Sequence, residues 1–292
     1  MSSVEDLREV APEPVTLDIK QQPEPKQPTL VSKCVNYLLK LQKYSAYGLT
    51  GFLGLHISSV VIVPGLSIPW ELCQEVFEMA RNVYLGIPFF EPIGIFGCGI
   101  VHIGSGIGIR FLRGHQRKTT NNHEVIIKDE QRNDIGLGGI TGLLGLGYKK
   151  SIILTIWPGM TPLSISGYVT GILLIVHIHK FRYVPLLIDG DLSLINLEYI
   201  GYVLQKSPLA GLGKWVNWTM LTLLVWTSSY HITSGWLRYM KKYSMRWKRL
   251  AYGIINGGFF LGVVALLRYR KVIVSNGFIG DAFNTYILKS WV

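Results

Sequence analysis

The sequence predicts an all-α integral membrane protein with about five transmembrane helices, and three observations support this prediction. Hydrophobic residues make up 49% of the 292 residues, and the mean hydropathy is +0.30. Only 16% of residues are charged, yet the formal net charge is +11. Long apolar segments nearly free of charge alternate with basic connections, as expected when charge is excluded from hydrocarbon.

The apolar segments fall at five places in the chain. We expect spans at about residues 46–63, 92–112, 163–178, 216–237 and 250–267. About 20 helical residues are enough to cross the roughly 30 Å of a bilayer core. Residues 135–157 are rich in glycine and contain Lys149 and Lys150, so we interpret them as an interfacial or re-entrant segment.

Residues 1–30 are predicted to form a disordered cytosolic tail. They contain Pro12, Pro14, Pro23, Pro25 and Pro28 among charged and amide side chains, and such a segment cannot bury enough apolar surface to fold. The tail has neither the apolar core of a secretory signal nor the basic composition of a transit peptide. A short interfacial helix is expected at residues 31–45, leading into the membrane.

The distribution of charge between the spans predicts the orientation. Residues 110–150 carry many Lys and Arg, and residues 238–249 are basic with no acidic residue. By contrast, residues 65–91 carry a single arginine, Arg81, against several glutamates. Because basic loops prefer the cytosolic side, the N-terminus is expected in the cytosol and, with five spans, the C-terminus on the opposite side.

Several functional classes are disfavoured by the sequence. A nucleic-acid-binding protein would spread its basic residues over a soluble surface and would not contain long uncharged windows. The three cysteines, Cys34, Cys73 and Cys98, have no metal-site spacing. Asp189 and Asp191 lie close together in a loop without an accompanying nucleophile or base. We therefore expect no nucleic-acid partner and no enzyme of the hydrolase or transferase type.

An internal repeat organises the apolar part of the chain. The motif His-Ile-x-Ser-Gly followed by Arg occurs at His102–Gly106 and again at His231–Gly235. The preceding spans are also similar, and they end at His56 and His177. We expect a first membrane repeat at residues 46–160, and a second repeat with a final appended helix at residues 161–292.

Polar residues in these spans share one helix face. Thr227, His231 and Ser234 are three or four residues apart, and Cys98, His102 and Ser105 follow the same pattern. Ionisable side chains within a membrane normally face the interior of the bundle. We therefore expect both stripes to face other helices.

Two interpretations of these stripes are open. In the first, the His, Ser and Thr side chains form hydrogen bonds between helices and hold the bundle together. In the second, the bundle binds haem b, which needs imidazoles from different helices, small neighbouring residues and cations near the membrane edge. The candidate cofactor-binding residues are His102, His231, His56, His177, Arg110, Arg238, Ser105 and Ser234. His102 and His231 would hold the haem iron, and the deeper His56 and His177 could serve a second haem.

The repeated His-Ile-x-Ser-Gly motif resembles the membrane-anchor cytochrome b subunits of succinate dehydrogenase and fumarate reductase. The likeness is short. It implies a duplicated helical unit and a haem-binding redox function, whereas nothing in the sequence indicates the flavin or iron–sulfur partner subunits of those complexes.

The tail carries a second resemblance. Residues 7–15, LREVAPEPV, resemble the Pro-x-Pro motif at the N-terminus of a fungal mitochondrial outer-membrane adaptor family. That resemblance implies recruitment of a bridge-like lipid-transfer protein of the vacuolar protein sorting thirteen family, and a role in mitochondrial lipid homeostasis. The partner-binding residues would be Leu7, Val10, Pro12, Glu13, Pro14 and Val15. Prolines favour an extended backbone, which suits addition of a strand to a sheet edge.

Three functional hypotheses follow from the sequence. The preferred one is a mitochondrial outer-membrane adaptor with a cytosolic tail that recruits a lipid-transfer protein at a contact site; its bundle could also scramble membrane phospholipids along the polar stripes. The alternative is a haem b-binding redox membrane protein of the succinate dehydrogenase cytochrome b type. The third is a purely structural membrane protein that does not need its tail.

Overall fold

The computed structural model describes residues 29–119, 137, 160–272 and 277–291, and every element in these ranges is helical. The long helices are α1 (Leu30–Ile57), α4 (Cys98–Thr119), α8 (Pro162–Ile178), α11 (Ala210–Tyr239) and α12 (Met245–Tyr269). The short helices are α2 (Val63–Gly65), α3 (Trp70–Leu85), α9 (Val184–Asp189), α10 (Leu197–Gln205) and α13 (Phe278–Lys289). π-Helical segments occupy Ser58–Ile62, Phe90–Gly97 and His179–Tyr183. The predicted all-α fold is confirmed.

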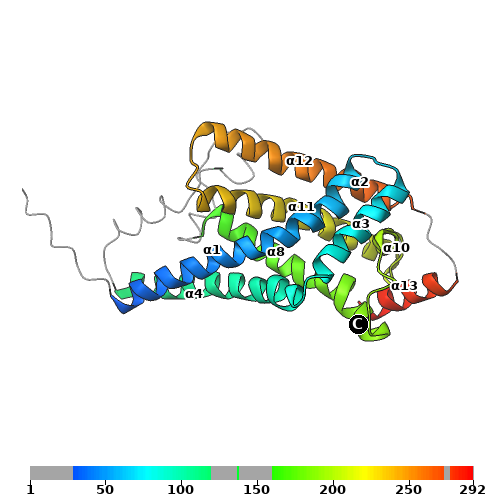
Figure 1. The fold of residues 1–292 in the computed structure, drawn as a ribbon, viewed down its shortest axis with the longest axis horizontal. Helices are drawn as coiled ribbons and strands as arrows, with labels where there is room; N and C mark the ends of the chain where they lie inside the picture. The colour runs from blue at the N-terminus through cyan, green and yellow to red at the C-terminus, as the bar shows by residue number, and fades with distance from the viewer. Residues whose placement is uncertain (1–28, 120–136, 138–159, 273–276, 292) are drawn as a thin grey trace, which may run out of the picture.

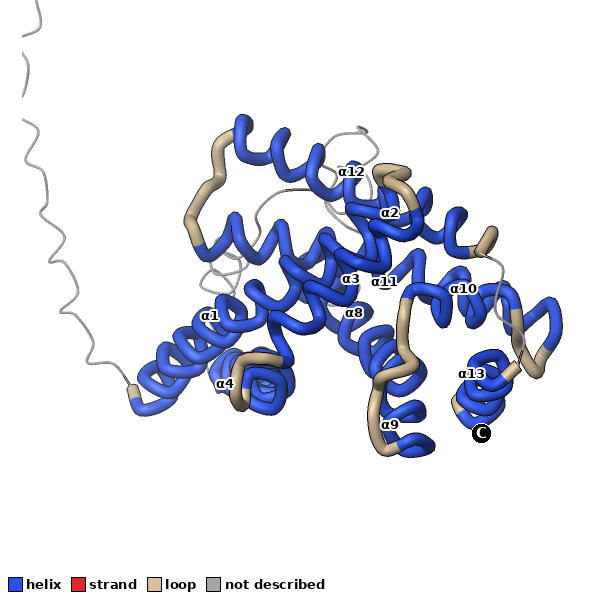
Figure 2. Tube along the Cα trace, turned by 45° about the vertical axis from the view of Figure 1, so that its right-hand side comes forward, coloured by secondary structure: helices blue, strands red, loops and turns tan. Residues whose placement is uncertain are grey.

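The long helices run alternately in opposite directions along an elongated body (Figure 1). α1 packs along α4, and α11 packs against both α8 and α12. The starts of α1, α8 and α12 therefore lie at one end, which we call the near end, together with the ends of α4 and α11. At the other, far end, α9, α10 and α13 group around the C-terminus (Figure 2).

Four helical stretches are long and apolar enough to cross a membrane: Leu30–Gly65, Phe90–Gln116, Pro162–Asp189 and Met245–Tyr269. They contain the first, second, third and fifth predicted spans. The predicted fourth span lies in α11, which is less apolar, so a fifth crossing stays a prediction. α11 packs against α8 and α12, and its Asn217 and Ser234 side chains are buried in protein. A helix covered by its neighbours can carry polar residues that a lipid-facing helix cannot.

α1 runs without a break through residues 31–45, the segment predicted as a separate interfacial helix. No proline or glycine lies between Val31 and Tyr47, so nothing in this sequence interrupts the helix. Its first turn is capped by Thr29, whose Oγ1 accepts a hydrogen bond from the Ser32 backbone N–H at 3.3 Å. The predicted interfacial helix and the first predicted span are thus one element. The predicted segment at 135–157 lies outside the described residues except for Leu137.

Two prolines occupy matching places in the two predicted repeats. Pro64 and Pro185 each follow a π-helical segment, at the same separation after His56 and His177. Proline has no N–H to donate, so helix carbonyls in the preceding turn lose a partner. Tyrosine hydroxyls from other elements supply donors at both places. Tyr269 donates to the Val60 carbonyl at 2.8 Å, and Tyr199 donates to the Lys180 carbonyl at 3.1 Å.

Polar contacts also connect the two halves of the chain at the far end. The Arg268 guanidinium on α12 donates to the Pro64 carbonyl at 2.7 Å and to the Ile68 carbonyl at 2.6 Å. The Leu197 backbone N–H donates to the Gln74 side chain of α3 at 3.1 Å. α2, α3, α10 and α12 are therefore held together where their chain segments turn.

The last helix, α13, packs onto the second half of the chain. Phe283 and Tyr286 are buried, and both rings contact the ring of Tyr199. The Tyr286 hydroxyl donates to the Asp189 carboxylate. Burial raises the pKa of Tyr286, and the hydrogen bond to Asp189 raises it further, so this hydroxyl stays protonated as a donor.

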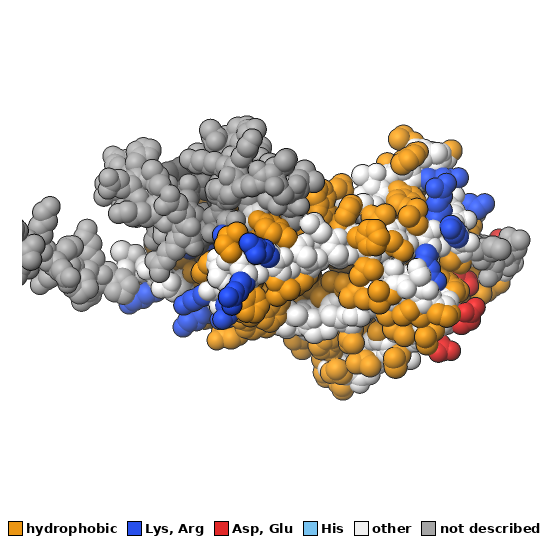
Figure 3. All heavy atoms as spheres, turned by 90° about the horizontal axis from the view of Figure 1, so that it is seen from above, with side chains coloured by type: hydrophobic (Ala, Val, Ile, Leu, Met, Phe, Trp, Pro, Cys, Tyr) orange, Lys and Arg blue, Asp and Glu red, His pale blue; other side chains and the backbone are white. Residues whose placement is uncertain are grey.

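Charge is distributed unequally between the two ends. Within the described ranges, all carboxylate side chains belong to the far-end segments: Glu71, Glu75, Glu78, Glu91, Asp189, Asp191, Glu198 and Asp281. The near end carries lysine and arginine from α1, α4 and the α11–α12 connection. In Figure 3, acidic side chains are visible only at the right-hand end. This asymmetry agrees with a cytosolic near end, although the orientation itself stays a prediction.

The tyrosine contacts at the proline sites give a test of the fold. Tyr269→Phe removes the donor to Val60, and Tyr199→Phe removes the donor to Lys180. Each change should lower the free energy of unfolding by about 1 kcal/mol, the scale of hydrogen bonds between membrane helices. Thermal unfolding of the protein in detergent, followed by circular dichroism, measures the loss. The matched control is Tyr183→Phe, because the Tyr183 side chain is 55% exposed; if all three variants unfold alike, the hydroxyls do not support the proline turns.

Candidate functional site

The residues predicted to bind a partner lie outside the described residues: Leu7, Val10, Pro12, Glu13, Pro14 and Val15. The structure shows where the tail joins the bundle. Thr29 and Leu30 are at the near end, and the Leu30 side chain is 78% exposed. A peptide leaving α1 at this point begins beside the basic surface of the near end.

The four predicted cofactor-binding histidines form two pairs, each joining the two predicted repeats. His102 on α4 and His231 on α11 have ring centroids 6.0 Å apart with an interplanar angle of 82°. His56 on α1 and His177 on α8 are also 6.0 Å apart, at 72°. We call these the near pair and the far pair, because α4 and α11 end at the near end and α1 and α8 end toward the far end. Four helices thus contribute one imidazole each, in two layers.

Backbone carbonyls fix the tautomer of the near pair. His102 Nδ1 lies 3.0 Å from the Gln42 carbonyl oxygen, and His231 Nδ1 lies 3.1 Å from the Leu163 carbonyl oxygen. A carbonyl only accepts hydrogen bonds, so Nδ1 carries the proton in both rings and Nε2 keeps its lone pair. Gln42 and Leu163 precede His56 and His177 by the same number of residues, so the two contacts are equivalent.

Three buried side-chain atoms on α8 and α11 have no hydrogen-bond partner among the described residues: Thr170 Oγ1, His177 Nδ1 and Ser234 Oγ. By contrast, the equivalent of Ser234 in the first repeat, Ser105, donates to the His102 carbonyl at 3.0 Å. Buried polar groups in proteins are normally paired with protein, water or ligand. The interior faces of α8 and α11 therefore retain unused hydrogen-bonding capacity.

Close packing around His231 depends on one glycine. A Cβ atom at Gly167 of α8 would lie 2.7 Å from His231 Cε1, which no side chain could occupy without displacing the ring. Ser166, the preceding residue, lies 3.4 Å from His231 Nδ1 through its hydroxyl. The sequence Ser-Gly on α8 thus positions the imidazole of α11.

The two arginines that follow the repeated motif lie on the same helices as the near pair. The Arg110 guanidinium lies over the Tyr168 ring at 5.2 Å and thereby links α4 to α8. Arg238 is half-buried near the end of α11. Both positions are on the near-end side of the histidines, where haem propionates would require cations.

Two imidazoles on different helices are the kind of donor that haem b takes from a protein, whereas a bare metal ion needs more ligands. Within the described ranges, no cluster of three His, Cys, Asp or Glu side chains could hold a metal ion. Haem iron takes only its axial ligands from protein. The Nδ1–H of each near-pair histidine is directed at a backbone carbonyl, which is a feature that metal-bound histidines share, and haem binding itself stays a prediction.

A buried lysine was not among the predicted site residues. Lys180 is 6% exposed, and its Nζ donates to Asn217 Oδ1 at 2.7 Å and lies 3.8 Å from the centroid of the Trp291 ring. A cavity of about 10 Å³, room for one water, is lined by His177, Lys180 and Asn217 among others. The predicted span ended at Ile178, whereas the helical stretch continues to Asp189. The signal in the sequence was Lys180 and Arg182 inside an otherwise apolar run.

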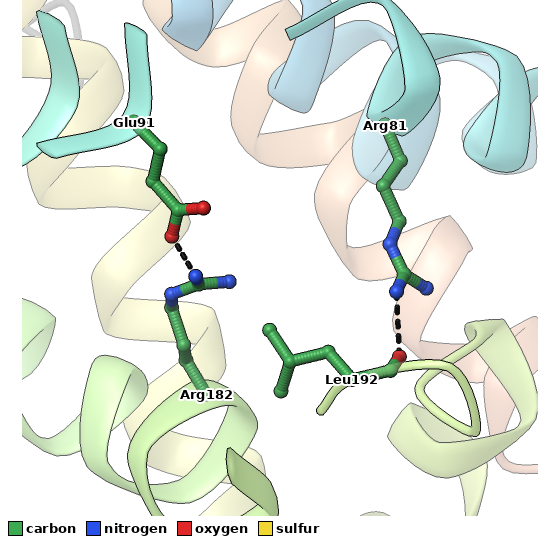
Figure 4. Close-up of polar contacts among 4 residues, drawn as sticks. All are labelled: Arg81, Glu91, Arg182 and Leu192. Carbon is green, nitrogen blue, oxygen red and sulfur yellow. Dashed lines mark hydrogen bonds and ion pairs between the residues drawn. The ribbon is translucent and has the colours of Figure 1, made fainter. Parts of the chain in front are cut away.

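Two arginines connect the predicted repeats next to this region (Figure 4). Arg81 of α3 donates to the Ile195 carbonyl at 3.0 Å and to the Leu192 carbonyl at 2.7 Å. Arg182 forms an ion pair with Glu91. These contacts between distant segments could not be inferred from helical periodicity, which reports only which residues share a helix face.

The fold and the buried polar interface define an all-helical integral membrane protein. The family described as MDM10-complementing protein 1, transmembrane domain, matches residues 51–153 and 172–280. Because the match covers more than half of the chain, the chain belongs to this family. His56 and His177 lie at the same distance from the starts of the two matched segments, and the division into two repeats stays a prediction.

A curated relative supports the assignment. The chain is 28% identical over 250 residues to the mitochondrial adapter protein MCP1 of Saccharomyces cerevisiae, a match that covers 82% of this chain and 76% of the relative. No solved structure matches the chain. The resemblance to a fungal mitochondrial adaptor is thus confirmed, and the chain is a mitochondrial membrane protein of the adaptor type. The resemblance to succinate dehydrogenase anchors stays a prediction.

Proposed function

We propose that this protein is an adaptor of the mitochondrial outer membrane that recruits a bridge-like lipid-transfer protein of the vacuolar protein sorting thirteen family. The tail would capture the partner through its Pro-x-Pro motif at a membrane contact site. The observation that carries the proposal is membership of the MDM10-complementing protein 1 family, with a relative named a mitochondrial adapter protein. In the present chain, the tail with the Pro-x-Pro motif precedes α1, the helix that starts at the near end.

The geometry of the attachment suits a tethered docking peptide. Between Pro14 and Leu30 the chain is long enough to extend about 50 Å when fully stretched. The motif can therefore reach a partner that sits well above the headgroup layer. The prolines limit the conformations of the free peptide, so less entropy is lost when it is bound as an extended strand.

The tail supplies its own matched control. Replacing Pro12 and Pro14 by alanine should weaken partner capture by about tenfold or more, as expected when an interface anchor is lost. Replacing Pro23 and Pro25, the second Pro-Glu-Pro of the tail, should leave capture unchanged because aliphatic residues do not flank it in the same way. Binding of the purified partner to the full-length protein in nanodiscs provides the measurement. Undiminished capture by the Pro12/Pro14 variant would refute the docking assignment.

The bundle would also scramble phospholipids, because lipids delivered to one leaflet must equilibrate with the other. The support lies in the buried faces of α8 and α11. There, Thr170, His177 and Ser234 carry polar atoms without a partner among the described residues. Such atoms can pair with water or a lipid headgroup as the interface opens, which lowers the penalty of moving the headgroup through hydrocarbon.

Scrambling can be measured by bleaching a fluorescent phospholipid from outside proteoliposomes. We expect the purified protein to expose the inner-leaflet probe and the Thr170→Val, Ser234→Val double variant to do so more slowly. Ser228→Ala is the control, because the Ser228 hydroxyl already donates to the Val225 carbonyl at 3.1 Å. Bleaching equal to that of protein-free vesicles would exclude scrambling, and equal rates in both variants would exclude these hydroxyls as the path.

A second candidate function, a haem b-binding redox membrane protein, is supported by the two histidine pairs. His102 and His231 would hold the iron of one haem through Nε2, with Ser105, Ser234, Arg110 and Arg238 around it, and His56 and His177 would serve a second. Bound haem would supply one-electron transfer. The chain's own contribution is to hold both imidazoles with Nδ1–H directed at carbonyls and to provide arginines on the near-end side.

An absorption spectrum of the purified protein tests this second function. Protein produced with ample haem should show a Soret band that is lost in His102→Ala and in His231→Ala. His179→Ala is the control, since the His179 ring stacks on Tyr183 and belongs to neither pair. A colourless wild-type preparation under these conditions would eliminate the redox function and leave the adaptor function untouched.

A further inference from the structure

The hairpin of α11 and α12 is basic at both ends and contains no acid. From Tyr199 to Gly280 the chain has no Asp or Glu. Its basic residues fall into two groups, one at each end of the helices. The near-end group is Arg238, Lys241, Lys242, Arg246, Lys248 and Arg249, and the far-end group is Lys206, Lys214, Arg268, Arg270 and Lys271.

The length of α12 sets the depth of these groups in a bilayer. α12 spans 25 residues and is one of the stretches apolar enough to cross a membrane. At about 1.5 Å per residue it is about 37 Å long, slightly more than the hydrocarbon core of roughly 30 Å. Arg246 and Arg249 at its start, and Arg270 and Lys271 after its end, therefore lie at the two opposite headgroup layers.

Most of these side chains are free to bind a ligand. Lys241, Lys242, Arg246 and Arg249 are exposed at the near end, as are Lys206, Lys214, Arg270 and Lys271 at the far end. In the part of the chain that the structure describes, none of these eight forms an ion pair with a carboxylate. Figure 3 shows basic side chains at both ends of the molecule. Arg268 is different, because it bonds the Pro64 and Ile68 carbonyls.

Membrane topology explains only half of this pattern. The preference of basic residues for the cytosolic side accounts for a cluster at one end of a hairpin, not at both. The far end does contain carboxylates, but they belong to other segments, such as Glu75 of α3, Asp191 in the loop before α10, and Asp281 of α13. The acid-free composition is thus a property of the hairpin and not of the whole end.

Aromatic side chains accompany the cations at each end. Trp247 is 36% exposed at the near end, where Lys242 Nζ lies 5.5 Å from the centroid of its ring, and Trp215 is 74% exposed near the start of α11. Exposed tryptophans at these depths are typical of the membrane–water interface. Cations beside interfacial aromatics bind a headgroup that carries net negative charge more strongly than a zwitterionic one, whose own ammonium group opposes them.

We propose that the two ends of the α11–α12 hairpin are binding sites for anionic phospholipid headgroups, one in each leaflet. The binding stands independently of the scrambling proposed above. If the bundle also scrambles lipids, these two sites would supply it with anionic phospholipids from both leaflets.

The test uses the full-length protein in phosphatidylcholine bilayers and spin-labelled lipids as probes. The association of labelled phosphatidylserine relative to labelled phosphatidylcholine is measured from the motionally restricted fraction of the electron spin resonance spectrum. We expect a preference of about threefold to fivefold for phosphatidylserine, since clustered basic residues near a membrane surface each contribute to anionic lipid binding.

Two charge-neutral variants separate the ends. The near-end variant is K241Q/K242Q/R246Q/R249Q and the far-end variant is K206Q/K214Q/R270Q/K271Q. Each should lower the preference, and the combination should bring it close to one. K33Q/K40Q is the control, because Lys33 and Lys40 are exposed basic residues of α1. All substitutions are at exposed positions, so the helices are expected to fold, and circular dichroism verifies this.

A wild-type preference near one overturns the proposal, as does a control variant that loses as much preference per charge as the hairpin variants. A far-end variant with unchanged preference shows that topology alone explains the basic residues and overturns the two-sided site. Because lipid movement is not measured, failure here is distinguishable from failure of scrambling or of partner recruitment.

Discussion

Every backbone carbonyl inside hydrocarbon needs a donor from the protein, and this constraint shapes the bundle. Pro64 and Pro185 interrupt the helix ladder at matching places, each after a π-helical segment. Tyr269 and Tyr199 reach across from other elements to the carbonyls affected. The same two tyrosines are buried in the far-end core, where they fix the positions of α10, α12 and α13. The two proline sites are therefore tied to the packing of the far end through these tyrosines.

The four histidines join the two predicted repeats in two layers. His56 on α1 contacts His177 on α8, and His102 on α4 contacts His231 on α11. The near pair is oriented by carbonyls of α1 and α8, which are the helices that carry the far pair. Each layer of the interface thus depends on the helices of the other layer.

Much of the fold could be predicted from the sequence, because helix length and apolarity are local properties. Four predicted spans coincide with helices that can cross a membrane. The helices α3, α10 and α13 are not among the predicted elements, because each is shorter than a membrane span and its acidic residues resemble those of a polar connection. Residues 31–45 and 46–63 are predicted as two elements, whereas α1 continues across their boundary because no proline or glycine lies between Val31 and Tyr47.

Of the candidate sites, too, some features follow from the sequence and others only from the structure. The face that carries His102, Ser105, His231 and Ser234 follows from helical spacing, but the partner of each ring does not. Lys180 was missed because a charge near the end of an apolar run is usually solvated, whereas here Asn217 and Trp291 cover it. The Pro-x-Pro motif is the opposite case. It is recognised from sequence alone, and residues 1–28 lie outside the described structure.

The contact between Lys180 and Trp291 has a consequence for biogenesis. Trp291 follows α13 and lies 111 residues after Lys180 in the chain, so this cation stays without its cover until α13 has been synthesised and has packed. The Asp189 carboxylate likewise receives its hydrogen bond from Tyr286 only after α13 has been synthesised. Assembly of the second half therefore waits for α13, and a chain truncated before α13 leaves a buried charge and an uncovered aromatic surface.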